Sequence, residues 1–133
     1  MKTRFALALA LVACLVAGSV TMAVAKPKVK KVETTVTLTY TQTGTPPYHQ
    51  SVFSGNVKAK KGCKKNRTIT IKNTATQTVV GTTTSASNGS FSISVAGVPA
   101  GNYQAEAAKR KRKKGNGTKI VCKKGVSNTV TVS

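Results

Sequence analysis

Apolar and polar residues alternate from Val32 to Thr41, and this pattern constrains the fold more than any other feature of the sequence. Successive side chains of a β-strand point to opposite faces of its sheet, so the alternation predicts a strand with one buried face. β-Branched residues, which favour strands, occupy much of both faces. The inward face would hold Val32, Thr34, Val36, Leu38 and Tyr40, and the outward face Glu33, Thr35, Thr37, Thr39 and Thr41.

Further short strands follow, with turn or loop residues between them. Asn88-Gly89 predicts a hairpin turn between two of these strands, because the pair accepts positive φ angles at little cost. Gly55 lies inside a strand pattern and predicts a bulge or a close backbone approach. The further strands are predicted at residues 51–59, 67–72, 79–85, 91–95, 102–108, 120–122 and 127–132.

No segment after residue 25 has the 3.6-residue apolar period of a helix. The sequence therefore predicts an all-β fold, an antiparallel Greek-key β-sandwich of about seven strands. A length of 133 residues allows one domain, which we place at residues 32–133. Aromatic residues make up 5% of the chain and tryptophan is absent, so we expect a thin core built mainly from valine, isoleucine and alanine.

Residues 1–25 have the three parts of a secretory signal peptide: a basic start, an apolar run over residues 5–20, and a small-x-small cleavage site at residues 23–25. Cleavage would release the protein outside the cell or into the cell envelope, without a transmembrane anchor. Residues 26–31 would then form a basic, flexible leader. The alternative is a retained membrane helix, although a full span needs about 20 predominantly apolar residues.

Three cysteines are present in the sequence. Cys14 lies in the predicted signal peptide, where residues 11–14 also have the form of a lipoprotein box that would lipidate this cysteine. Signal cleavage leaves Cys63 and Cys122, which an oxidising compartment would join as a disulfide, contributing about 4 kcal/mol by the chain-entropy estimate. The alternatives are a redox or a zinc role, but zinc takes about four ligands and His49 is the only histidine.

Positive charge dominates the composition. The formal net charge is +20, from 22 lysines and arginines against 2 acidic residues. Such a surface attracts polyanions and resists self-association, which favours a monomer. The candidate polyanion-binding residues lie in three basic runs: Lys60, Lys61, Lys64 and Lys65; Lys109, Arg110, Lys111, Arg112, Lys113 and Lys114; and Lys123 and Lys124.

The run at residues 109–114, together with Gly115-Asn116-Gly117, is predicted to form a long, flexible loop. The three basic runs have two interpretations. They could bind acidic polymers, namely cell-wall polyanions, anionic lipids or extracellular nucleic acid, with an affinity that falls as salt rises. Aromatic residues for base stacking are missing from the runs, which argues against sequence-specific recognition of nucleic acid. The alternative is a solvated cationic surface that only keeps the protein soluble.

Catalytic side chains are scarce. Aspartate is absent, and the acidic residues are Glu33 and Glu106. A hydrolase with paired carboxylates would need both glutamates to converge. A Ser-His-acid triad would need His49, which lies beside prolines in an expected loop. We therefore predict a protein that is not an enzyme and that carries no cofactor or metal.

Several segments from about Ser51 onward match a known group of modules: residues 53–57, Cys63, residues 67–71, residues 88–93, residues 99–105, Cys122 and Ser127. Through these segments the chain resembles the transthyretin-like and carboxypeptidase regulatory-like (Cna-B-like) group of secreted β-sandwich modules, especially the exported single-domain type of actinobacteria. The resemblance implies a sandwich fold and says almost nothing about activity. Related adhesin modules form a Lys–Asn isopeptide bond with a glutamate placed four residues after a tyrosine. Glu106 is three residues after Tyr103, so we predict no isopeptide bond.

Two function classes follow from these features. The first is a secreted, non-enzymatic module with a structural or accessory role at or outside the cell envelope. The alternative is a secreted polycation that binds acidic polymers through its lysine and arginine runs.

Overall fold

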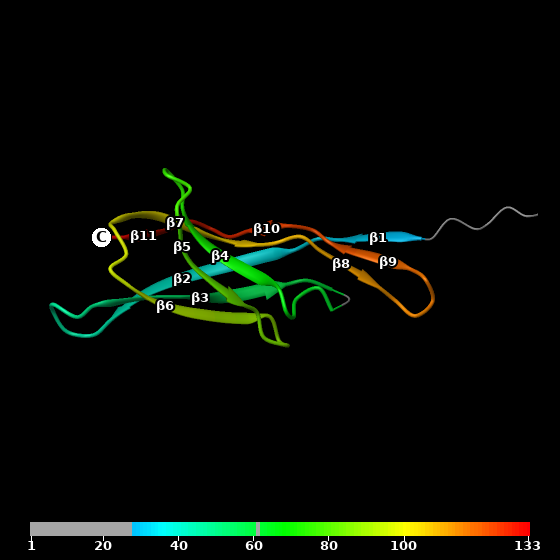
Figure 1. Cartoon of the computed structure of the whole chain (residues 1–133), viewed down its shortest axis with the longest axis horizontal. Helices are drawn as coiled ribbons and strands as arrows, with labels where there is room; N and C mark the ends of the chain where they lie inside the picture. Colours follow the sequence, from blue (N-terminus) through cyan, green and yellow to red (C-terminus); the bar gives the residue numbers. More distant parts are fainter. Residues whose placement is uncertain (1–27, 61) are drawn as a thin grey trace, which may run out of the picture.

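The computed structural model describes residues 28–60 and 62–133. The predicted signal peptide, Cys14 and Lys61 lie outside the described residues. The described chain consists of β-strands without a helix, and it forms eleven strands in three sheets (Figure 1). The predicted all-β, sandwich-like class is therefore confirmed.

Two of the sheets make the sandwich. The first sheet has the order β2-β3-β6, and the second has the order β10-β7-β4-β5, with β11 also pairing with β7. The strands of the first sheet are β2 (Thr35–Thr43), β3 (Gln50–Lys58) and β6 (Ser90–Ala96). Those of the second sheet are β4 (Thr68–Asn73), β5 (Val79–Thr84), β7 (Gly101–Ala107), β10 (Gly125–Val126) and β11 (Val130–Val132).

The third sheet, which we call the ribbon, projects from one end of the sandwich, and the β2–β3 loop lies at the other end (Figure 1). Its order is β1-β9-β8. Strand β1 runs parallel to β9, whereas β8 runs antiparallel to it. The ribbon strands are β1 (Val29–Val32), β8 (Arg110–Lys113) and β9 (Lys119–Cys122).

The core lies between the two sandwich sheets and follows the predicted alternation. Apolar residues of β2, β3 and β6 in the first sheet face those of β4, β7 and β11 in the second. Phe53 is fully buried, and its ring centroid lies 5.4 Å from that of Tyr40 and 5.7 Å from that of Tyr103. Three aromatic residues thus fill the centre of a core that is otherwise small. The buried members are Val36, Leu38, Phe53, Val57, Ile69, Ile71, Phe91, Tyr103, Ala105, Ala107 and Val132.

The alternating segment from Val32 to Thr41 forms two strands instead of one. The chain leaves the ribbon after Val32 and enters the first sandwich sheet at Thr35. Both strands keep the predicted inward residues, because the break at Glu33 and Thr34 preserves the two-residue period. The residues before Val32 also differ from the prediction: Val29 to Lys31 form part of β1 and are not a leader.

The predicted hairpin at Asn88-Gly89 is wrong. A local turn does form, since the Ala86 amide donates to the Ser90 carbonyl at 2.8 Å. However, β6 pairs with β3, whereas β5 pairs with β4, so this turn carries the chain from one sheet to the other. Within the Asn-Gly pair only Gly89 has a positive φ, of 91°. A type I′ hairpin turn requires positive φ at both residues.

Gly55 shows the predicted close approach, and the pairing of β3 with both neighbours continues through it without a register shift. A Cβ atom there would collide with the Thr37 carbonyl and would lie 2.8 Å from the Phe91 ring. The glycine therefore makes room for a buried aromatic ring.

Asn128 joins the two sheets at the edge of β2. Its side-chain oxygen accepts from the Leu38 amide at 3.0 Å, and its side-chain nitrogen donates to the Leu38 carbonyl at 2.9 Å. The neighbouring Ser127 hydroxyl accepts from the Ala105 amide in β7 at 2.8 Å. These bonds satisfy backbone groups that have no strand partner there.

Candidate functional site

The ribbon separates its side chains into two faces. Four register rows link β1, β9 and β8. Because side chains alternate along each strand, alternate rows share a face. The face that we call the outer face contains the rows Val29–Lys119–Lys113 and Lys31–Val121–Lys111. The inner face contains the rows Lys30–Ile120–Arg112 and Val32–Cys122–Arg110.

The inner face is buried against the loop of residues 59–66, which we call the cap loop. Val32, Ile120 and Cys122 form a small cluster with Cys63 of the cap loop, and Ala59 packs against it. The predicted disulfide between Cys63 and Cys122 is confirmed, with the two Cα atoms 5.4 Å apart. The bond therefore fastens the cap loop beneath the ribbon.

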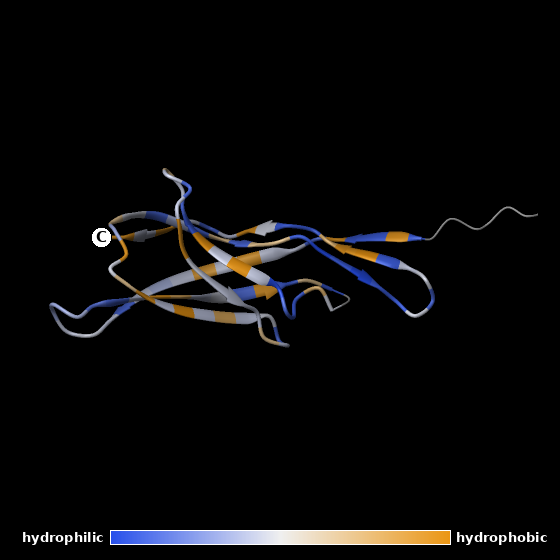
Figure 2. Cartoon of the chain, viewed as in Figure 1, coloured by the Kyte–Doolittle hydropathy of each residue, from blue (hydrophilic) through white to orange (hydrophobic). Residues whose placement is uncertain are grey.

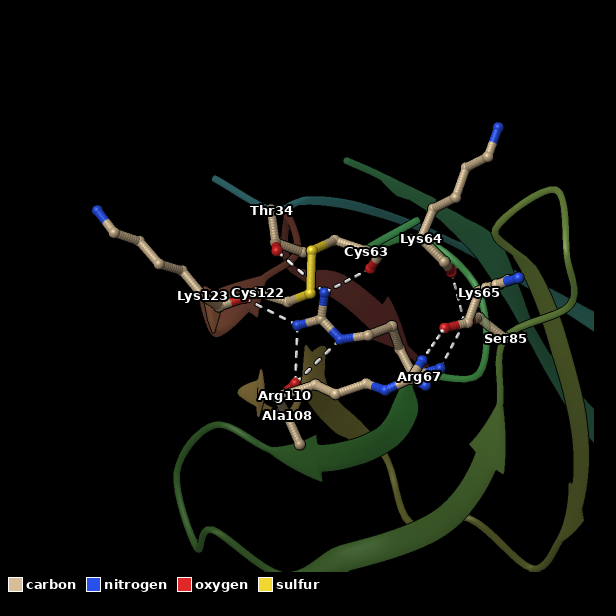
Figure 3. The surroundings of a disulfide bond; sticks show 10 residues. All are labelled: Thr34, Cys63, Lys64, Lys65, Arg67, Ser85, Ala108, Arg110, Cys122 and Lys123. Carbon is tan, nitrogen blue, oxygen red and sulfur yellow. Dashed lines mark hydrogen bonds between the residues drawn. A yellow bond between two sulfur atoms is a disulfide. The ribbon is translucent and has the colours of Figure 1, made fainter. Parts of the chain in front are cut away.

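Arg67 lies under this disulfide, and it is the largest fully buried side chain of the described residues. Figure 3 shows its guanidinium surrounded by oxygen atoms of four different segments. It donates to the Ala108 carbonyl at 2.7 and 3.0 Å, to the Lys123 carbonyl at 2.8 Å, and to the Cys63 carbonyl at 2.7 Å. A further bond reaches the Thr34 hydroxyl at 3.1 Å.

All the acceptors of the Arg67 guanidinium among the described residues are thus neutral oxygen atoms. Burial lowers the pKa of Arg67 below its ordinary value, and the positive charge of Arg110 lowers this pKa further. The backbone of Arg67 is held as well, because its amide donates to the Ser85 hydroxyl at 2.9 Å. That hydroxyl donates to the Lys64 carbonyl at 2.7 Å, which fixes the cap loop next to β4.

The basic run from Lys109 to Lys114 contains strand β8, and not the flexible loop that the sequence suggests. Its two arginines point to the inner side. Arg110 donates to the Lys65 carbonyl at 2.8 Å, and the Arg112 guanidinium lies against Gly62, where a Cβ atom would collide with it. Arginine suits this task because its planar fork makes several directed hydrogen bonds.

The lysines of the same run lie on the opposite, outer side. Lys111 and Lys113 are exposed, as is Lys109 just before the strand. Lys119 of β9 and Lys31 of β1 are exposed on the same face, and Figure 2 shows strongly hydrophilic segments along the ribbon. Two valines interrupt this face. An open depression is lined by Val29, Val121, Lys111, Lys113 and Lys119, and a neighbouring one by Lys31, Lys109, Val121, Lys123 and Lys124.

Both acidic side chains of the sequence lie away from the tip of the ribbon. Glu33, at the base of the outer face, pairs with Lys123. Glu106, on the outside of the second sandwich sheet, lies 3.3 Å from both Lys72 and Lys124. The predicted binding residues Lys123 and Lys124 are therefore partly neutralised. The five outer-face lysines form no ion pair with a carboxylate of the described residues.

The predicted site residues gather at one end of the molecule but point in different directions. Lys60, Lys64 and Lys65 are exposed on the cap loop, and Lys114 is exposed next to the β8–β9 turn. In Figure 3 the side chains of Lys64 and Lys123 both point away from the disulfide, to different sides. Lys61 lies outside the described residues.

The sequence prediction missed Lys31 and Lys119, which complete the outer face. The signal for this arrangement was present in residues 109–113, where lysine and arginine alternate with the two-residue period of a strand. Every side chain in these residues is charged, so they lack the apolar-polar alternation that normally indicates a strand.

The single histidine and the two glutamates are the side chains on which a catalytic site would depend. His49 is exposed beside the Pro46-Pro47 turn, and the two glutamates sit in separate ion pairs. Residues 28–60 and 62–133 contain no group of three His, Cys, Asp or Glu side chains able to hold a metal ion. The same residues include no helix long and apolar enough to cross a membrane.

Comparison with protein-family models, curated proteins and solved structures found no match to this chain.

Proposed function

We propose that this protein is a secreted, non-enzymatic module that binds polyanions through the outer face of its ribbon. One observation carries the proposal: Lys31, Lys109, Lys111, Lys113 and Lys119, from three separate strands or strand ends, share one exposed face without an acidic partner. A cationic surface that served only solubility would not require lysines to be gathered in this way.

The chemistry of the outer face supports nonspecific recognition. Each lysine presents a mobile point charge that can neutralise a phosphate, sulfate or carboxylate, and the counterions released from the polymer favour binding. The arginines could recognise a particular acidic group through their planar guanidinium groups, but they contact the protein itself. Arg110 donates to the Lys65 carbonyl, and Arg112 lies against Gly62. The outer face also lacks aromatic rings for stacking bases.

Secretion and the family resemblance are parts of the same proposal. A disulfide persists in oxidising compartments, and it supports the predicted export. The resemblance to transthyretin-like and carboxypeptidase regulatory-like modules stays a prediction. A purely structural or accessory role at the envelope is the alternative, and it requires no binding by the ribbon.

Heparin affinity with matched variants tests the proposal. Lys111→Glu/Lys113→Glu reverses two charges on the outer face, and Lys60→Glu/Lys64→Glu reverses two on the cap loop. Both variants have the same net charge. We expect only the outer-face variant to lose retention at about 0.3 M salt, and its salt slope to fall by at least about 2. Equal losses would show that net charge alone governs binding. Unchanged retention of both variants would leave only the structural role.

A further inference from the structure

We propose that the ligand of the outer face is an anionic lipid surface, on which the ribbon lies with its valines against the headgroup region. This inference rests on the proposed function and selects one polyanion from the possible classes. Two features of the structure carry it, namely the exposed apolar residues among the lysines and the positive charge that surrounds them.

The valines distinguish a membrane from a dissolved polymer. Val29 is 54% exposed, and Val121 lies between Lys31 and Lys111 in the register of the ribbon. An acidic polymer in water has little apolar surface to offer these side chains. A bilayer accepts lysines at the level of its phosphates and small apolar side chains just below, which is how amphipathic surfaces bind to membranes.

The distribution of charge on the outer face also favours an anionic lipid surface as the ligand. Lysines surround the two valines on both sides, and the register places Lys113 beside Lys119 in the same row as Val29. The acidic side chain on the outer face is Glu33, which is paired with Lys123 at the base of the ribbon. A second copy of the chain would bring two strongly cationic faces together, so self-association does not explain the exposed valines.

Vesicle binding tests the inference with protein purified from the export medium, its N-terminus defined by intact mass. The probes are vesicles of phosphatidylcholine alone and vesicles with about 30% phosphatidylglycerol, with heparin and duplex DNA as soluble polyanions. Each lysine near an anionic surface contributes roughly fivefold to partitioning. We therefore expect Lys111→Gln/Lys113→Gln to weaken binding to the anionic vesicles roughly 25-fold, and we expect no binding to phosphatidylcholine alone.

A valine variant separates lipid from polymer. Val29→Ser leaves the charge unchanged and should weaken vesicle binding several-fold without changing heparin retention. Val79→Ser is the matched control, because Val79 is 50% exposed on the sandwich. Binding to heparin or DNA without binding to anionic vesicles would overturn this inference and leave the proposed function standing. Equal behaviour of the two valine variants would also overturn it, and failure to bind any of the anionic probes would overturn both proposals.

Discussion

Removing the Cys63–Cys122 disulfide should open the ribbon before it unfolds the sandwich. The buried cluster of the ribbon consists of Val32, Cys63, Ile120 and Cys122, so half of its members are the bonded cysteines. The sandwich core has eleven buried members and contains no cysteine. The ribbon therefore depends on the bond for its packing, whereas the sandwich has its own core.

The size of the effect follows from the loop that the bond closes. A sequence separation of 59 residues corresponds to about 4 kcal/mol of stabilisation in the chain-entropy estimate. For a domain of this size, 1 kcal/mol shifts the midpoint of thermal unfolding by about 4–8 °C. A loss of about 4 kcal/mol would therefore lower the midpoint by about 15–30 °C. Small domains have about 5–15 kcal/mol of total stability, so the sandwich is expected to remain folded at room temperature.

Amide hydrogen exchange can follow the two parts separately. The Lys119 and Lys123 amides, bonded to the Lys28 and Val32 carbonyls, report on the ribbon, and the Ser127 amide, bonded to the Ala105 carbonyl, reports on the sandwich. We expect reduction, or a double alanine variant of the two cysteines, to remove protection from the first two amides only. Retention of protection in the reduced ribbon would refute the reasoning, as would simultaneous loss at all three amides.

Three substitutions test other contacts by thermal or denaturant unfolding. Arg67→Lys should cost about 2–4 kcal/mol, because an ammonium cannot reach the carbonyls on both sides of the guanidinium; an unchanged midpoint would contradict the role of this network. Gly55→Ala should cost about 1–3 kcal/mol through overpacking, because the added methyl group would collide with the Thr37 carbonyl and press on the Phe91 ring; a stabilised variant would show that both can move away. Asn128→Ala should cost about 1–3 kcal/mol, because the Leu38 amide and carbonyl lose their partners; a loss below about 0.5 kcal/mol would mean that water replaces the amide.

The buried side of the sandwich could be predicted from the sequence because local periodicity determines it. Val36, Leu38, Ile69 and Ile71 are all buried, as their alternation indicates. The pairing of strands is a different problem, since it depends on contacts between distant segments. Asn88-Gly89 marks a turn correctly, but its local chemistry cannot show whether the next strand joins the same sheet or the opposite one.

The sequence predicted where in the chain the candidate site lies, but it did not predict which of its side chains are exposed. The disulfide between Cys63 and Cys122 follows from compartment and cysteine count, and it correctly brings the basic runs to one end. Charge alone could not show that Arg110 and Arg112 serve the fold while Lys111 and Lys113 remain exposed. Nor could it show that Lys31, six residues after the predicted cleavage site, belongs to the same face.

Repulsion between its lysines lowers the stability of the folded ribbon. Lys113 lies directly opposite Lys119 on adjacent strands, where like charges destabilise a sheet. The disulfide and the Arg67 network oppose this repulsion by fixing the cap loop, β8 and β9 at their bases. A surface selected only for solubility could distribute the same charges over the sandwich without such a cost. The concentration of unpaired lysines on a braced ribbon is therefore best explained by a ligand that neutralises them, and binding of that ligand would stabilise the folded ribbon by mass action.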